Sequence, residues 1–296
     1  EYTPVHEYHS WVEPSEKVSS LNDETLLHFP YDKFTDVLDV ICKEADTVES
    51  IILSVYRLSD NSDIVAMIAY LLKLGVDVTI LIEINAKGNE EANIRYAHQL
   101  KIMGAQVIVC DSVKKNHAKF IYITRVQLPA VAMIMTGNLN EVTANIYEDY
   151  CYITSDPDIT IKIRSVIMQL ITGLKSPPCE SNTVFFTQEN AAMTLVSNIK
   201  QQAQLGRQGR IIIKCNLLSD ILFMGLLETA AEAGCEIDII CRGECCWKPK
   251  HLNVKIHRFL HKHLEHSRVY VFGRDNPNIY IGSLDLASHK LYGRFE

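Results

Sequence analysis

Two short elements of the sequence place a histidine two residues before a cation, and both could handle phosphate. The first is His117-Ala-Lys119 and the second is His266-Ser-Arg268. We expect both elements to lie on strands, where side chains two residues apart share a face, so each imidazole stands beside a fixed positive charge. An imidazole can attack phosphorus or move a proton, and the cations would neutralise the phosphoryl oxygens. The pair predicts phosphoryl transfer, with both histidines in one cleft.

Each element is followed by a further strand-like run that ends in a small polar turn. The turns are Met135-Thr-Gly-Asn138 and Gly282-Ser-Leu-Asp285. A single His-x-Lys sequence has little value as a signal, whereas two copies in the same context are a much stronger one. The alternative, that both elements are inert strands of a duplicated scaffold, stays open at this point.

The segments that must position these histidines also occur twice. A β-rich run, a helical pattern and a second β-rich run occupy residues 50–57, 63–74 and 75–83, and the same order returns at 210–216, 220–233 and 234–242. Alternation of this kind is typical of an α/β fold with a largely parallel sheet. We therefore predict an internal duplication: a lead-in from an upstream domain over residues 1–24, a first domain over 25–177 and a second over 178–296.

Composition narrows the class of protein. The 296 residues carry a net charge of −7 and are 47% hydrophobic, which suits globular domains and disfavours a protein that coats nucleic acid. The segment Arg242–Arg274 departs from this average, because its eight Lys or Arg and two acidic residues give it a charge of +6. Focused positive charge of this kind can attract phosphate.

The same composition bears on the location of the protein. The longest uncharged stretch, residues 126–140, is too short to span a bilayer, so no integral membrane segment is expected. The nine cysteines are odd in number and several lie in apolar runs, which favours a reducing, cytoplasmic compartment.

Taken together, the motifs resemble the phospholipase D superfamily, and more specifically the C-terminal catalytic half of the long-chain polyphosphate kinases. The resemblance extends from about Leu26 to Glu296. The segments that carry it include Leu27-His-Phe-Pro-Tyr-Asp-Lys-Phe34, Val55-Tyr-Arg57, His117-Ala-Lys119, Thr136-Gly-Asn138, Tyr147-Glu-Asp149, Arg242-Gly243 and Leu264-Glu-His-Ser-Arg-Val-Tyr270. It implies two duplicated phospholipase D-like α/β domains, each with a mostly parallel sheet flanked by helices, face to face around one cleft.

The resemblance also implies an activity. The family transfers the terminal phosphate of ATP reversibly to inorganic polyphosphate through a phosphohistidine. By position, His117 resembles the phosphorylated nucleophile, and His266 resembles a second catalytic histidine that also contacts the nucleotide phosphates. The expected supporting residues are Lys119, Asn138 and Arg268 at the transferring group and Tyr147 and Arg242 at ATP.

Two further positions correspond to those that the family associates with magnesium (Mg2+). Arg57 occupies the first, and Lys87 replaces an arginine at the second. A guanidinium has no lone pair to give a metal, so we expect Arg57 to touch phosphate oxygens that the ion also binds. ATP, ADP and polyphosphate are the expected partners. The resemblance further implies a homo-oligomer in the cytoplasm, including its membrane periphery.

Several departures keep two other functions open. Lys87, Met135 and the altered segment after Ser283 differ from the family pattern. They favour an inactive polyphosphate-binding remnant. Because the N-terminal and helical domains of the family are missing from this sequence, we also expect residues 1–296 alone to have little activity. The wider superfamily offers a phosphodiesterase or phosphatidyltransferase instead. Neither His-x-cation element is followed by the Asp expected of a phospholipase, which favours the kinase.

Overall fold

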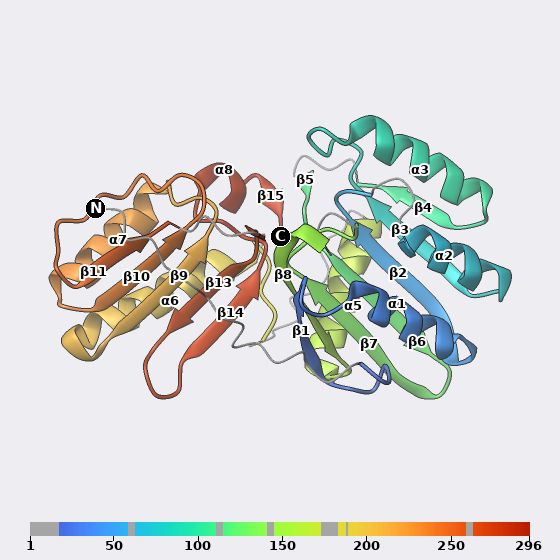
Figure 1. Cartoon of the computed structure of the whole chain (residues 1–296), viewed down its shortest axis with the longest axis horizontal. Helices are drawn as coiled ribbons and strands as arrows, with labels where there is room; N and C mark the ends of the chain where they lie inside the picture. Colours follow the sequence, from blue (N-terminus) through green and yellow to red (C-terminus); the bar gives the residue numbers. More distant parts are fainter. Residues whose placement is uncertain are drawn as a thin grey trace.

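The computed structural model describes residues 18–58, 63–110, 115–140, 145–172, 183–187, 189–258 and 263–296. Two α/β halves lie side by side, and the C-terminus lies between them (Figure 1). We call residues 25–172 the first half and residues 183–296 the second half. The predicted lead-in lies largely outside the described residues, as does the predicted boundary at residues 177–178.

The first half is built on a sheet whose strands lie in the order β1-β8-β7-β6-β2-β3-β4. Their bounds are β1 Thr25–Phe29, β2 Val48–Val55, β3 Asp77–Ile82, β4 Gln106–Val109, β6 Phe120–Arg125, β7 Leu128–Met135 and β8 Tyr147–Thr154. The helices are α1 Phe34–Lys43, α2 Asp63–Lys73, α3 Glu90–Ile102 and α5 Pro157–Thr172, and a 3₁₀ turn covers Ala45–Thr47.

The second half has a five-stranded sheet in the order β11-β10-β9-β13-β14. Its strands are β9 Arg210–Cys215, β10 Glu236–Cys241, β11 Val254–His257, β13 Arg268–Phe272 and β14 Asn278–Gly282. Its helices are α6 Ala191–Gln204, α7 Ile221–Glu232 and α8 Ser288–Leu291, with a 3₁₀ turn at Gly206–Gln208.

The two sheets repeat one topology. In the first, β4-β3-β2-β6-β7 has the same order and the same strand directions as β11-β10-β9-β13-β14 in the second. The predicted strand-helix-strand units match β2-α2-β3 and β9-α7-β10 closely. The duplication predicted from the sequence is therefore present in the fold.

Both sheets are mixed, so the prediction of mostly parallel sheets is wrong. β2, β3 and β4 are parallel, but β6, β7, β8 and β1 join them antiparallel. The connection between β6 and β7 is too short for the crossover that a parallel pair needs, so these strands form a hairpin. In the second sheet β13 and β14 are antiparallel for the same reason.

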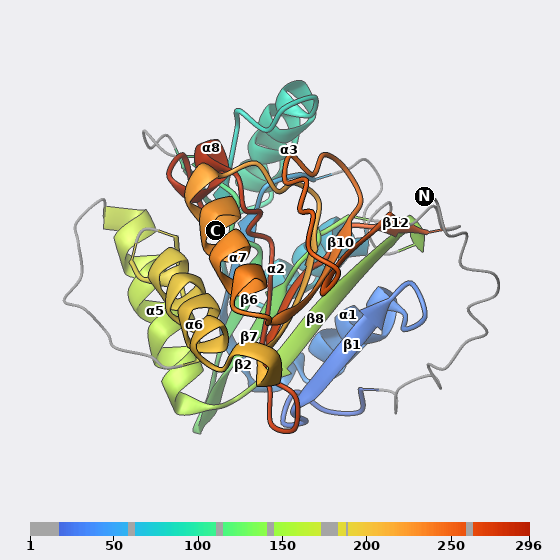
Figure 2. The ribbon, with the colours of Figure 1, turned by 90° about the vertical axis from the view of Figure 1, so that its left-hand side faces the viewer.

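The cores follow the alternation of side chains along the strands. Ile121 and Ile123 of β6 pack with α1, α2 and α3 on one face of the first sheet, whereas Phe120 and Tyr122 pack with α5 on the other. Figure 2 shows α1 and α5 on opposite sides of this sheet. In the second core, α6 packs against α7 and against β9 and β13. Among the described residues, no helix is both long enough and apolar enough to cross a membrane.

Two short parallel pairings join the halves. β5 (Lys115–Asn116) of the first half pairs with β15 (Arg294–Phe295) of the second. β12 (Leu264–Glu265) of the second half pairs with β8 of the first. Each pairing ends beside one of the histidine elements, so these contacts determine where the two elements lie.

Candidate active site

Both histidines lie in breaks between strands, so the prediction that the elements lie on strands is wrong, except for Arg268, which begins β13. Residues 117–119 join β5 to β6, and residues 266–267 join β12 to β13. In both cases the chain changes its pairing partner at the histidine, from the other half of the molecule to its own sheet. The break leaves the histidine backbone outside the regular ladder.

In both copies the cation two residues on donates a hydrogen bond to the carbonyl oxygen of the histidine. Lys119 Nζ lies 2.6 Å from His117 O, and Arg268 Nη1 donates to His266 O. The expected neighbourhood of imidazole and cation is therefore present twice, although the strand geometry predicted for it is not.

His117 faces a carboxylate from the second half. Its backbone N–H donates to Phe295 O (2.7 Å), continuing the β5–β15 pairing. This places Glu296 Oε2 3.2 Å from His117 Nδ1. Lys119 Nζ lies 3.0 Å from the same nitrogen, and the Tyr56 ring packs edge-on against the imidazole at 4.5 Å.

His266 is held by a carboxylate from the first half. Its backbone N–H donates to Glu148 O (3.2 Å), continuing the β12–β8 pairing. Asp149, the next residue of β8, has its carboxylate oxygens 2.9 and 3.0 Å from His266 Nδ1. Thr136 Oγ1 donates to Asp149 Oδ1 (2.6 Å), and the Tyr147 ring lies 5.1 Å from the imidazole. The two histidines are thus paired reciprocally across the halves.

Burial and nearby cations lower the pKa of both imidazoles, which favours their neutral forms. Burial lowers the pKa of His117 to about 3, with Lys119 acting in the same direction and Glu296 against it. Burial also lowers the pKa of His266, although Asp149 opposes the shift. The Lys119 charge contributes to the lowered pKa of His266, so the two clusters share one electrostatic environment. A neutral imidazole has the lone pair that a nucleophile or a base requires.

The two cations of the site differ in their own ionisation. Burial lowers the pKa of Lys119 to about 7, outweighing the attraction of Glu296. Arg268 keeps its charge, because Asp285 accepts from its Nε (3.1 Å) and Nη2 (2.8 Å) and raises its pKa against the effect of burial. Asp285 also accepts from Lys290, which makes it the anionic centre of the second cluster.

Arg242 and Asn138 lie beside these clusters. Arg242 follows β10, and its lowered pKa reflects burial first and the Arg268 charge second, with Asp285 and Tyr147 acting in the other direction. Asn138 lines a small hollow together with Asp149, and its Oδ1 is buried without a hydrogen-bond partner among the described residues.

The structure brings Arg57 and Lys87 together, but not as a metal site. Arg57 donates to the backbone carbonyl of Lys87, and its guanidinium lies 5.7 Å from the centre of the Tyr56 ring, the same ring that packs on His117. The Lys87 side chain is exposed. Neither cationic side chain can coordinate Mg2+. In the described part of the chain, the acidic and histidine groups close enough to share an ion are Glu228 and Glu232 of α7 and His251, which lies between β10 and β11.

Sequence reasoning missed the three carboxylates that organise the site: Asp149, Glu296 and Asp285. Asp149 stands in a segment that carries the family resemblance and Glu296 does not. The partners of both are far away in the chain, so no local spacing marks them. Asp285 was grouped with Asn138 as a turn residue, whereas its carboxylate binds two cations.

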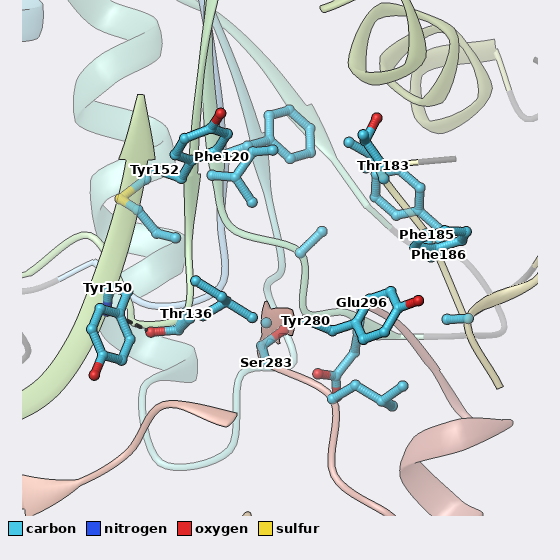
Figure 3. Close-up of a pocket in the computed structure, with 18 of the residues that line it drawn as sticks. Phe120, Thr136, Tyr150, Tyr152, Thr183, Phe185, Phe186, Tyr280, Ser283 and Glu296 are labelled. Atoms are coloured by element: carbon cyan, nitrogen blue, oxygen red, sulfur yellow. Dashed lines mark hydrogen bonds between the residues drawn. The ribbon is translucent and has the colours of Figure 1, made fainter. Parts of the chain in front are cut away.

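A mostly apolar cavity adjoins the site. It measures about 450 Å³ and is lined by residues of both halves, with Lys119 and Glu296 in its wall. Figure 3 shows the aromatic side chains of Phe120, Tyr152 and Phe185 around it. Such a lining is unsuited to a chain of phosphates, which needs cations and hydrogen-bond donors.

Comparison with known proteins decides the family. The family model described as polyphosphate kinase C-terminal domain 1 matches residues 17–176, more than half of the chain, and that for C-terminal domain 2 matches residues 184–296. The chain belongs to the polyphosphate kinase family. The resemblance predicted from the motifs is confirmed.

Individual polyphosphate kinases show the extent of the match. The one from Lactiplantibacillus plantarum is 30% identical over 98% of this chain and 42% of its own length. The one from Helicobacter pylori is 31% identical over 100% of this chain and 44% of its own length. The crystal structure of polyphosphate kinase from Porphyromonas gingivalis aligns with a TM-score of 0.81 and 27% identity, covering 92% of this chain and 43% of that one. The chain therefore spans less than half the length of the curated relatives it matches.

The site predicts a large loss of stability when Asp285 is replaced. In Asp285→Ala the buried cations Arg268 and Lys290 lose their shared carboxylate. Removing one partner of a buried ion pair costs about 3–5 kcal/mol, so we expect a loss of this size in the free energy of unfolding. Urea denaturation of the full-length natural protein measures it. Asp275→Ala, which changes an exposed residue, is the control, and an equal effect of both variants would contradict the argument.

Proposed function

We propose that this chain carries the site that moves the terminal phosphoryl group of ATP to inorganic polyphosphate through phosphorylation of His117. The observation that carries the proposal is the pair of buried histidines, each with a carboxylate near Nδ1 and a cation at its carbonyl oxygen. Membership of the polyphosphate kinase family supports the choice of substrates.

In the first step, His117 acts as the nucleophile. In this step the ring proton lies on Nδ1, which faces Glu296 Oε2 at 3.2 Å, while Lys119 donates to the carbonyl oxygen of His117. The lone pair is then on Nε2. Nε2 attacks the terminal phosphorus of ATP, the bond from phosphorus to the bridging oxygen breaks, and ADP leaves. Lys119 offsets the negative charge on the transferring group. Arg268, whose charge Asp285 compensates, supports the site by holding the carbonyl oxygen of His266.

In the second step, a terminal oxygen of polyphosphate attacks the phosphorus on His117. The nitrogen–phosphorus bond breaks, the imidazole recovers its lone pair, and polyphosphate gains one unit. His266, with Nδ1 held by Asp149, is placed to exchange a proton through Nε2 with the attacking or leaving oxygen. Each step can run backwards, which accounts for reversible transfer.

Other residues have expected roles around this centre. Tyr147 and Arg242 would bind ATP, and the amide of Asn138 would support the transferring group. Arg57 and Lys87 would contact phosphate oxygens, and magnesium would reach the site bound to those phosphates. No step is assigned to the ion, because these two residues offer it no ligands.

We also infer that the chain divides into two domains, 25–177 and 178–296, and works in the cytoplasm. The repeated strand order supports the division. The eight cysteines that the structure describes are free thiols, which supports a reducing compartment.

The first test of the proposal is covalent labelling. The full-length natural protein, incubated with ATP that carries a radioactive terminal phosphate, should gain an acid-labile, base-stable label. His117→Ala should abolish this label, because the nucleophile is gone. His98→Ala, which changes an exposed histidine on α3, should label normally. Equal labelling of His117→Ala would refute the proposal, as would hydrolysis of phosphodiesters by a protein that takes no label from ATP.

The second test is the pH dependence of kcat/KM for ATP, which reports the ionisation of the free enzyme. Lys119 must be charged to act on phosphate, and its pKa of about 7 means that this charge is lost as the pH rises. We expect kcat/KM to fall as the pH rises through about 7. Lys119→Arg should move this fall above about pH 9, because a guanidinium keeps its proton.

The control for this profile is Lys73→Arg, on the exposed side of α2, which should leave the fall where it is in the natural protein. A Lys119→Arg protein whose kcat/KM falls at the same pH as the natural protein would show that Lys119 is not the titrating group.

A further inference from the structure

Asn216 and Arg242 meet at one edge of the second sheet. Asn216 follows β9 and Arg242 follows β10, and these parallel strands end in register at Cys215 and Cys241. Asn216 Oδ1 accepts hydrogen bonds from Arg242 Nε (2.9 Å) and Nη2 (2.5 Å). The amide oxygen therefore fixes one edge of the guanidinium plane.

We propose that Asn216 is a positioning residue that orients Arg242 toward the nucleotide phosphates without neutralising its charge. The inference rests on the proposed function, in which Arg242 binds ATP. Two of the five N–H groups of the guanidinium are used by Asn216, so three remain for phosphate oxygens.

The group that orients Arg242 is an uncharged amide oxygen and not a carboxylate. In the described part of the chain no carboxylate forms an ion pair with Arg242, whereas Arg268 in the same sheet is paired with Asp285. A carboxylate would hold the guanidinium in the same way, but it would also cancel the charge that attracts a polyanion. An amide oxygen orients the guanidinium without cancelling its charge, which suits an arginine that binds an anionic ligand.

The backbone of Asn216 is anchored independently of its side chain. Its N–H donates to Asp285 Oδ1 (2.7 Å), and its carbonyl accepts from the N–H of Gly243 (3.0 Å). A Cβ atom on Gly243 would lie 2.4 Å from this carbonyl oxygen, so glycine permits the close approach. Because these contacts are made by the backbone, replacing the Asn216 side chain should remove only its hydrogen bonds to Arg242.

The experiment measures the KM for ATP and kcat in the full-length natural protein and in Asn216→Ala, Arg242→Ala and the double variant. Asn216→Ala frees the guanidinium to rotate. We expect its KM to rise roughly tenfold, the scale of one or two charge-assisted hydrogen bonds, with a smaller change in kcat. In the Arg242→Ala background the same substitution should change the KM less than about twofold, because the group it positions is absent.

Asn216→Asp protects the test against misfolding of the alanine variant. It keeps both hydrogen bonds to Arg242 but adds a negative charge, so its thermal unfolding should match the natural protein while its KM for ATP still rises roughly tenfold. Asn253→Ala is the matched control, because the Asn253 side chain also makes two hydrogen bonds, here to backbone carbonyl oxygens, but lies at the opposite end of β10. It should leave the KM unchanged.

The outcomes separate the inference from the proposed function. A natural protein that neither binds ATP nor takes its phosphate refutes the proposed function itself. An active natural protein with an unchanged KM in Asn216→Ala or Asn216→Asp overturns the positioning role. So does an equal effect of Asn216→Ala with and without Arg242, which would show that Asn216 acts on the fold and not through the arginine.

Discussion

The arrangement of the site depends on two imidazole–carboxylate pairs that cross between the halves in opposite directions. Glu296 of the second half faces His117 of the first, and Asp149 of the first half faces His266 of the second. Each pair is set by a short parallel strand pairing that ends at the histidine, β5 with β15 and β12 with β8. Neither half alone contains a complete pair, so the duplicated fold yields one site rather than two.

The charges buried around these pairs explain how the imidazoles stay neutral without destabilising the interior. Asp285 compensates Arg268 and Lys290, and burial leaves Lys119 close to its point of deprotonation. The Glu296 pKa stays below its usual value, because His117, Lys119 and Arg268 outweigh the effect of burial. A polyanion that enters would find cations already in place, and the site would need little reorganisation. The net charge of −7 therefore does not exclude a phosphate-rich substrate.

The repeated fold and the two histidines could be predicted from the sequence, because the sequence patterns that mark them are local. The strand-helix-strand units, the His-x-cation elements and their duplication all occupy short runs. The mixed sheets were missed because Gln127, a residue with no special turn preference, closes the β6–β7 hairpin at a positive φ of 56°. Asp149 and Glu296 were missed as organising residues because their partners lie in the other half, 117 positions away for Asp149. Only three-dimensional packing shows that these two acids hold the histidines.

The central claim is that the reciprocal carboxylates hold Nδ1 of each histidine and leave Nε2 to the substrate. The measurement that tests it most directly is the NMR spectrum of the phosphorylated full-length natural protein with nitrogen-labelled histidine, which identifies the nitrogen bonded to phosphorus. The account predicts phosphorus on Nε2 of His117, with Nδ1 still protonated toward Glu296. Phosphorus on Nδ1 of His117, or on His266 in place of His117, would contradict it.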